Sequence, residues 1–266
     1  GPYFVAEFYP AWFDVWGQRH STVDYKRPAE QLDWMLGQGV SVSMYMFHGG
    51  TNFWYMNGAN TAGGYRPQPT SYDYDAPLGE WGNCYPKYYA FREVIQKHLP
   101  HGTVLPEVPA DNPTTTFATI ELKESAPLQA AFHQTTESEN VLSMEDLGVD
   151  FGYIHYQTTI NKAGKQKLII QDLRDYAVIL VDGKQVASLD RRYNQNNVML
   201  DIQKAPATLE ILVENTGRVN YGPDILFNRK GITNQVLCGD EKLTGWSITP
   251  LPLYKEKVSE MNFGES

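Results

Sequence analysis

The chain has 266 residues, 42% of them hydrophobic and 20% charged, with a formal net charge of −9 at pH 7. That length favours about two domains, and the apolar content is typical of globular cores and not of a disordered chain. The acidic balance leaves no basic stripe for phosphates, and no run approaches the roughly 20 apolar residues of a membrane span, so we expect neither a nucleic-acid nor a membrane partner.

The first predicted element is a strand over residues 3–6, an apolar run without alternation that ends at a single acid, Glu7. Such a run is typical of a strand covered on both faces, as in a parallel sheet or a (β/α) barrel. Acids at the carboxyl end of a barrel strand are often catalytic, and the aromatic residues of segment 8–17 would offer flat apolar faces to a sugar ring. The alternative is a structural acid paired with a base at the barrel rim.

Two strand and helix units are predicted next. A helix opens at Pro28 and stops at Gly37 and Gly39, a strand covers residues 40–47, and a second helix opens at Pro86. A closed barrel of this class needs eight such units. We therefore expect this part of the chain to expose strand edges and an uncovered apolar wall.

Residues 49–85 form a predicted loop rich in glycine, asparagine, proline and aromatic residues. Loops of such length in compact domains are usually functional or disordered, and the aromatic content favours function. Asp73, Asp75 and Glu80 lack the glycine and the spacing of a calcium loop, and the glycine pairs lack the Lys-Ser/Thr of a phosphate loop. We expect no metal and no cofactor, and we expect His48 to be structural.

Prolines recur between residues 100 and 113, which predicts a linker over 106–115 between a first domain, 1–105, and a second, 116–253. The second domain carries short alternating segments typical of a β-sandwich, at Thr116–Leu122, Gly152–Ile160, Lys167–Gln171, Tyr176–Val181 and Thr208–Val213. Asp182-Gly183 between apolar runs predicts a type I′ hairpin. Residues 254–266 turn polar and are predicted to be a linker or tail.

Four motifs follow one another along the chain: Glu7–Gly17, Tyr45–Phe53, Pro69–Leu78 and Leu209–Gly222. In these motifs the chain resembles the family 35 glycoside hydrolases, the family of the lysosomal and bacterial β-galactosidases, from its first residue to about Leu253. The resemblance implies an α/β plus all-β fold, the C-terminal portion of a (β/α)8 TIM barrel followed by a jelly-roll β-sandwich. It also implies that six units with the proton-donating Glu precede residue 1, so we expect a fragment that is inactive alone.

The resemblance implies a retaining exo-β-galactosidase that hydrolyses terminal non-reducing β-D-galactose residues. Retaining glycosidases use one carboxylate as nucleophile and a second carboxyl group, about 5 to 5.5 Å away, as acid and base. Glu7 stands at the nucleophile position of the family, and the general acid/base Glu belongs to the segment we expect to be missing. The partners so implied are a galactoside and that N-terminal barrel segment, while the oligomeric state is not indicated.

Four aromatic residues complete the predicted site. By resemblance Tyr74 contacts the sugar, although it could instead pack the loop onto the barrel. Tyr45, if it points into the pocket, could donate to Glu7 and stabilise its charged form. Tyr9 and Trp12 either line the sugar site or belong to the core.

Alternatives remain open at this stage. A non-catalytic carbohydrate-binding or scaffold fragment, or a family member acting on another β-linked sugar such as glucosamine, would share these motifs. The polar segment 215–221 either binds carbohydrate or joins the two domains by hydrogen bonds. By resemblance the protein is secreted, periplasmic or lysosomal, and the lack of an Asn-x-Ser/Thr acceptor slightly favours a bacterial source.

Overall fold

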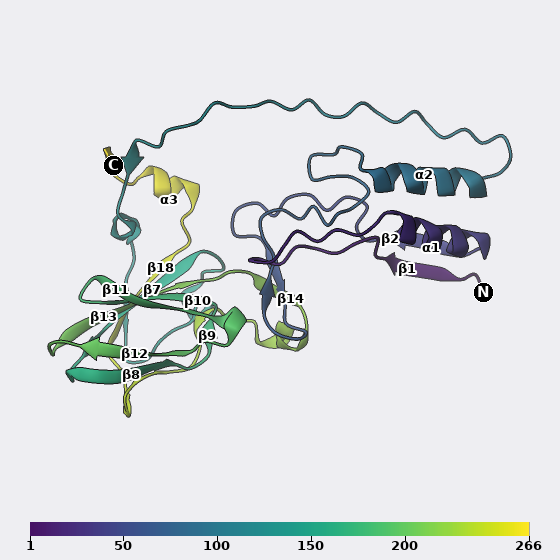
Figure 1. Cartoon of the computed structure of the whole chain (residues 1–266). Helices are drawn as coiled ribbons and strands as arrows, with labels where there is room; N and C mark the ends of the chain where they lie inside the picture. Colours follow the sequence, from purple (N-terminus) through teal and green to yellow (C-terminus); the bar gives the residue numbers. More distant parts are fainter. Residues whose placement is uncertain (266) are drawn as a thin grey trace. The chain divides into compact units, whose positions relative to one another are not determined.

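The computed structural model describes residues 1–265, which form two compact units (Figure 1). The first unit comprises residues 1–57 and 67–118, and the second comprises residues 58–66 together with the chain from Thr119 onward. The first is mixed α/β, whereas the second is all-β apart from short helical turns. Residues 58–66, which lie inside the predicted loop 49–85, therefore belong to the all-β unit, and we call this segment the excursion 58–66.

The first unit contains two parallel strands and two helices. Strand β1 (Phe4–Phe8) pairs with β2 (Ser41–Met44), and the helices are α1 (Lys26–Gly37) and α2 (Pro86–His98). Both predicted helices are confirmed, with Pro86 in the first turn of α2 and Gly39 in a left-handed conformation after α1. The helices and strands share one small core, formed by Phe8, Ala29, Leu32, Met35 and Phe91.

The expectation that the first strand is covered on both faces is wrong for the described chain. Tyr3 is 76% and Phe4 63% exposed, because β1 has a single neighbouring strand and no described element covers its second face. Trp34 on α1 is likewise 67% exposed, so large apolar side chains of this unit lie at its surface. Strand β2 also ends three residues earlier than predicted. The Tyr45 N–H still donates to the Phe8 carbonyl, but the Phe47 carbonyl accepts from the Leu78 N–H of the long loop.

The long loop folds onto the first unit through isolated bridges, such as His48 with Leu78 and Thr51 with Ser71. Its second half contributes Tyr74 and Ala76 to a separate apolar cluster with Ala11 and Phe13. A part of the loop thereby becomes core, which explains why it has a defined path without regular secondary structure.

Two antiparallel sheets share one apolar core in the second unit. The six-stranded sheet has the order β11 (Lys184–Asp190), β10 (Tyr176–Val181), β13 (Ala207–Glu214), β7 (Tyr153–Ile160), β18 (Trp246–Leu251) and β6 (Thr136–Ser138). The four-stranded sheet has the order β12 (Asn197–Ile202), β8 (Gly164–Ile170), β16 (Val236–Cys238) and β17 (Glu241–Lys242). Alternate residues of both sheets point inward, as burial on a pleated strand requires, and Trp246 and Tyr156 are the largest buried side chains of that core.

Smaller elements complete the second unit. These are β3 (Gly58–Asn60), β4 (Arg66–Pro67), β14 (Arg218–Tyr221), β9 (Leu173–Arg174), β15 (Gly231–Ile232), β5 (Glu124–Ser125), β19 (Gly264–Glu265), α3 (Lys255–Ser259) and the 3₁₀ turns η1 (Leu128–Ala131), η2 (Glu145–Leu147), η3 (Arg191–Tyr193) and η4 (Pro223–Phe227). Strand β3 pairs in parallel with β14, which anchors the excursion 58–66 to this unit. None of the helices formed by residues 1–265 is long and apolar enough to cross a bilayer.

Most predicted strands of the second unit are confirmed. Strands β7, β8, β10 and β13 lie where the alternating segments predicted them. The Asp182-Gly183 turn joins β10 to β11, and both residues have positive φ, at +49° and +74°, as a type I′ turn requires.

The strand predicted over Thr116–Leu122 is wrong. Within residues 1–265 this segment has no regular structure and no pairing strand, so Phe117, Ile120 and Leu122 remain 77%, 75% and 85% exposed. Alternating apolar and polar residues suit the two faces of a β-strand, but the backbone forms a strand only where a neighbouring strand pairs with its N–H and C=O groups. The predicted tail, residues 254–266, instead contains α3 and β19, and β19 pairs with β5.

Candidate active site

Glu7 lies on β1, one residue before the strand ends at Phe8. Successive side chains of a strand point to opposite faces, and the Phe8 ring packs 6.1 Å from Phe91 in the core while Glu7 is exposed. The Tyr9 hydroxyl donates a hydrogen bond to Oε2 of Glu7. Because β1 and β2 are parallel, their carboxyl ends meet at one edge, where the Tyr45 N–H donates to the Phe8 carbonyl at 2.9 Å.

The four aromatic residues predicted from the sequence form a closed circuit of ring contacts. The ring centroids lie 5.6 Å apart for Tyr9 and Trp12, 6.3 Å for Trp12 and Tyr74, 5.9 Å for Tyr74 and Tyr45, and 6.2 Å for Tyr45 and Tyr9. Three of these contacts are edge-to-face, a favourable arrangement for aromatic quadrupoles. The circuit brings together residues that follow β1 and β2 and a residue of the long loop.

Exposure differs sharply around this circuit. Tyr9, Trp12 and Tyr45 are 47%, 45% and 41% exposed, whereas Tyr74 is 2% exposed. Burial, together with the neighbouring phenols of Tyr45 and Tyr9 and the charge of Glu7, raises the pKa of Tyr74 well above its ordinary value of 10.0. The Tyr74 hydroxyl therefore stays protonated at neutral pH and is available as a hydrogen-bond donor.

Tyr45 has a different hydroxyl partner from the one that the sequence suggested. Its oxygen lies 3.5 Å from that of Tyr72, while the phenol that donates to Glu7 is Tyr9. Burial, followed by the hydrogen bond with Tyr45, raises the pKa of Tyr72 far above the usual tyrosine value. Tyr72 also stacks on Phe13, with centroids 6.3 Å apart and an interplanar angle of 12°.

The loop carboxylates around Tyr74 accept hydrogen bonds from protein donors. Asp73 Oδ2 accepts from the Tyr85 hydroxyl at 3.0 Å and from the Glu80 N–H at 3.2 Å. Asp75 Oδ2 accepts from Lys87 Nζ at 2.8 Å and from a backbone N–H at 2.7 Å. Over residues 1–265 no three His, Cys, Asp or Glu side chains converge as metal ligands.

Lys87 is the residue near the site that the sequence analysis missed. It is 2% exposed, although lysine is almost never fully buried without a partner. A signal was present, because Lys87 stands four residues before Phe91 on α2 and therefore shares its inward face.

A histidine and an aspartate support the segment that follows Glu7. His20 Nδ1 lies 2.8 Å from Asp14 Oδ2, and Asp14 Oδ1 accepts from the Ser21 N–H at 2.7 Å. The hydrogen bond with Asp14 raises the pKa of His20 above 6.5 despite partial burial. His48 Nε2 lies 3.2 Å from the Glu80 carbonyl oxygen, so it also contacts the loop.

In the second unit, the polar segment 215–221 is engaged within its own unit. Asn215 Nδ2 donates to the Asp150 carbonyl at 2.9 Å, and Arg218 donates to the same carbonyl at 2.7 Å and to Glu145. These contacts join β14 to the turn that precedes β7. Tyr221 is 64% exposed.

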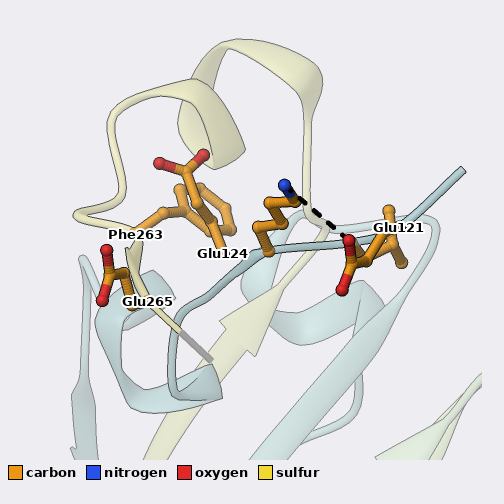
Figure 2. Close-up of a pocket in the computed structure, with 6 residues that line it drawn as sticks. Glu121, Glu124, Phe263 and Glu265 are labelled. Atoms are coloured by element: carbon orange, nitrogen blue, oxygen red, sulfur yellow. Dashed lines mark ion pairs between the residues drawn. The ribbon is translucent and has the colours of Figure 1, made fainter.

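A cavity of about 710 Å³ lies on the second unit between residues 121–124 and the C-terminal segment, lined by Glu121, Leu122, Lys123, Glu124, Phe263 and Glu265 (Figure 2). The only basic residue of its lining, Lys123, lies 3.7 Å from Glu121, and both side chains are largely exposed. None of the predicted site residues lines it, so the candidate active site remains the aromatic circuit around Glu7.

Comparison with known proteins bears on both units. Residues 1–98 match the profile described as glycosyl hydrolases family 35, and residues 141–252 match that described as the first all-beta domain of beta-galactosidase. A β-galactosidase of Xanthomonas manihotis is 41% identical over 256 residues, which is 95% of this chain and 42% of that protein. The β-galactosidases of Mus musculus and Homo sapiens are 41% and 38% identical, and the chain covers 39% and 37% of their lengths.

Among solved structures, a GH2 β-galacturonidase of Eisenbergiella tayi bound to galacturonate matches 44% of this chain and 24% of its own, with 19% identity and a TM-score of 0.29. The chain spans about two fifths of the length of the curated relatives above. Sequence identity near 40% extends over 94–95% of this chain, and the Glu7 segment lies inside the matched residues. The chain therefore belongs to family 35 of the glycosyl hydrolases.

Proposed function

We propose that the full-length protein is a retaining exo-β-galactosidase that releases terminal non-reducing β-D-galactose, with Glu7 as its nucleophile. The single observation that carries this proposal is the meeting of Glu7 with Tyr9, Trp12, Tyr45 and Tyr74 at the carboxyl ends of two parallel strands. Catalytic residues of (β/α)8 barrels lie at that end. In the proposal the first unit supplies the last two strand and helix units of such a barrel, and the all-β unit is a jelly roll.

Each group of the site has a chemical task in this mechanism. Glu7 attacks the anomeric carbon while the bond to the aglycone oxygen breaks and the general acid gives that oxygen a proton, which forms a covalent glycosyl ester. Water, deprotonated by the same group now acting as base, then displaces Glu7 and releases the sugar with net retention. The hydroxyl of Tyr9 holds Oε2 of Glu7 and leaves the second oxygen for attack. The exposed faces of Tyr9, Trp12 and Tyr45 offer apolar surface to the pyranose ring, and Tyr74 offers a protonated hydroxyl.

The proton donor is a second carboxyl group, which the proposal assigns to a part of the protein outside this sequence. Asp73 and Asp75 are poor candidates because their carboxylate oxygens already accept hydrogen bonds from donors of the protein. Asp14 is likewise held by His20 and by the Ser21 N–H. Galactose as the sugar is supported by the named β-galactosidase relatives, and a family member acting on another β-linked sugar is the alternative.

The proposal is tested by Glu7→Gln in the full-length protein. Hydrolysis of a chromogenic β-galactoside should fall by about 10³-fold or more, because the nucleophile is lost while the shape of the site is kept. Glu30→Gln, which changes an exposed carboxylate on α1, is the matched control and should retain wild-type kcat/KM. Wild-type activity in Glu7→Gln would overturn the proposal.

A further inference from the structure

Tyr74 and the next residue share an unusual backbone conformation. Tyr74 has a φ of +65° and Asp75 a φ of +49°, so two consecutive residues with side chains lie in the left-handed region. This region crowds the β-carbon against the backbone and is rarely adopted by residues other than glycine. Such a conformation persists only where surrounding contacts fix it.

Asp75 carries the contacts that fix this conformation. Lys87 Nζ donates to both the carbonyl and the carboxylate of Asp75, the latter at 2.8 Å. The same carboxylate oxygen accepts from the Val23 N–H at 2.7 Å, and the Asp75 N–H donates to Asp73 Oδ1 at 3.1 Å. Both ends of the Asp75 backbone and its side chain are thereby held in place.

The position of Lys87 is poor for stability alone. Its side chain is 3% exposed, so its charge is almost fully removed from water, and that desolvation usually cancels much of the attraction in an ion pair. It also stands in the first turn of α2, where the helix dipole disfavours a cation. A buried cation in such a place points to a conformational role.

We propose that Lys87 is a positioning residue of the glycosidase reaction, which acts through Asp75 to fix the orientation of the Tyr74 ring against Trp12 and Tyr45 and, with it, the position of the Tyr74 hydroxyl. This inference rests on the proposed function, because it assigns Tyr74 a task in that reaction. Lys87 itself does not touch the sugar. Its effect on turnover is therefore confined to what Tyr74 contributes.

The experiment is a double-mutant cycle in the full-length enzyme with Lys87→Met, Tyr74→Phe and the double variant. We expect each single variant to lower kcat/KM for an aryl β-galactoside by about 10- to 100-fold, the size of effect typical of a misplaced binding group. The double variant should be no worse than Tyr74→Phe alone, since the hydroxyl that the lysine keeps in position is then already absent. Lys97→Met is the matched control, a 63% exposed lysine on the same helix paired with Asp33, and should leave kcat/KM within about twofold of wild type.

A purely structural role of Lys87 would give a different result. Its loss would then lower activity by the same factor in the Tyr74→Phe variant as in the wild type, and that additivity would overturn the inference while leaving the proposed function intact. The proposed function fails separately, if Glu7→Gln retains activity. If Lys87→Met does not fold, Asp75→Asn takes its place, because it keeps the side-chain shape and an acceptor for the Val23 N–H but removes the charge. The same cycle with Tyr74→Phe then distinguishes the positioning role from the structural one.

Discussion

Each of the two units contains a buried lysine paired with an aspartate, and the two pairs are built differently. In the first unit Lys87 holds Asp75, which is 19% exposed and has a left-handed backbone. In the second unit Lys230 and Asp175, 0% and 2% exposed, lie 2.5 Å apart. The first pair borders the candidate site, whereas the second lies far from any predicted site residue along the chain.

The Lys230 and Asp175 pair belongs to a network of ion pairs and hydrogen bonds, in which Arg191 contacts both Asp175 and Asp224. Lys230 Nζ also donates to the Gly217 carbonyl at 2.6 Å, and Asp175 accepts from Arg191 and from the Tyr65 hydroxyl, each at 2.9 Å. Burial lowers the pKa of Lys230 to about 8, although the nearby carboxylate of Asp175 opposes that shift. The network joins the excursion 58–66 to the strands of the all-β unit.

A buried lysine paired with an aspartate therefore serves a different purpose in each unit. A network satisfied on all sides makes one packing unique, and removing a member leaves an uncompensated buried charge. A pair at the edge of a site, holding a strained backbone, instead determines where a neighbouring side chain points. The second unit should therefore lose stability on mutation, whereas the first should lose activity.

The largest expected effect is the loss of Asp175. Asp175→Asn should destabilise the second unit by about 3 to 5 kcal/mol, because it leaves the buried Lys230 without its counterion. Hydrogen exchange of β7 and β13 in the full-length protein measures this loss. Unchanged protection of β7 and β13 would show that the network does not stabilise the second unit, and would contradict the contrast drawn between the two pairs.

Measuring stability against pH tests whether Asp175 is charged in the folded protein. Burial would raise the pKa of Asp175, but the charges of Lys230 and Arg191 outweigh it and lower that pKa below 3.8. A carboxylate with a depressed folded-state pKa contributes stability above its unfolded pKa, and this contribution is lost as the pH falls below about 4. The stability gap between wild type and Asp175→Asn, measured by denaturant unfolding, should narrow from pH 5 to pH 3. A constant gap would contradict the charged state assigned to Asp175.

The smallest expected effect is Tyr65→Phe. This change removes the hydroxyl that bonds Asp175 and the Gly217 carbonyl but keeps the ring, over which Arg191 lies 4.4 Å from the centroid. The expected cost is about 1 to 3 kcal/mol, the usual penalty for leaving buried partners unpaired. Exchange should increase in peptides covering residues 58–66 before it increases in β7. Uniform loosening would show that Tyr65 does not anchor the excursion specifically.

The elements that could be predicted from the sequence are those whose signals are local. Pro86 and the spacing of Phe91, Val94 and Ile95 determine α2, and the turn at Asp182-Gly183 determines a hairpin. The segment Thr116–Leu122 was predicted as a strand from the same kind of alternation, yet it has no partner in the described chain. Strand pairing depends on residues far away in sequence, which alternation does not report.

The sequence motifs predicted the residues of the candidate site, but they did not predict the buried lysines and their partners. Glu7, Tyr9, Trp12, Tyr45 and Tyr74 come together because two parallel strands end at one edge and the long loop returns to it. The burial of Lys230 gave no signal, because its neighbours Asn228, Arg229 and Gly231 are typical of an exposed turn. Its partner Asp175 lies 55 residues away, so only the fold brings the pair together.

The central claim, that Glu7 is the nucleophile, is tested most directly by trapping the covalent intermediate in the full-length protein. A 2-deoxy-2-fluoro-β-galactoside with a good leaving group forms the glycosyl ester but hydrolyses slowly, since fluorine destabilises the oxocarbenium-like transition state. Digestion and mass spectrometry should place one fluorogalactosyl group on the Glu7 carboxylate, and none in Glu7→Gln. A label on any other residue would contradict the assignment.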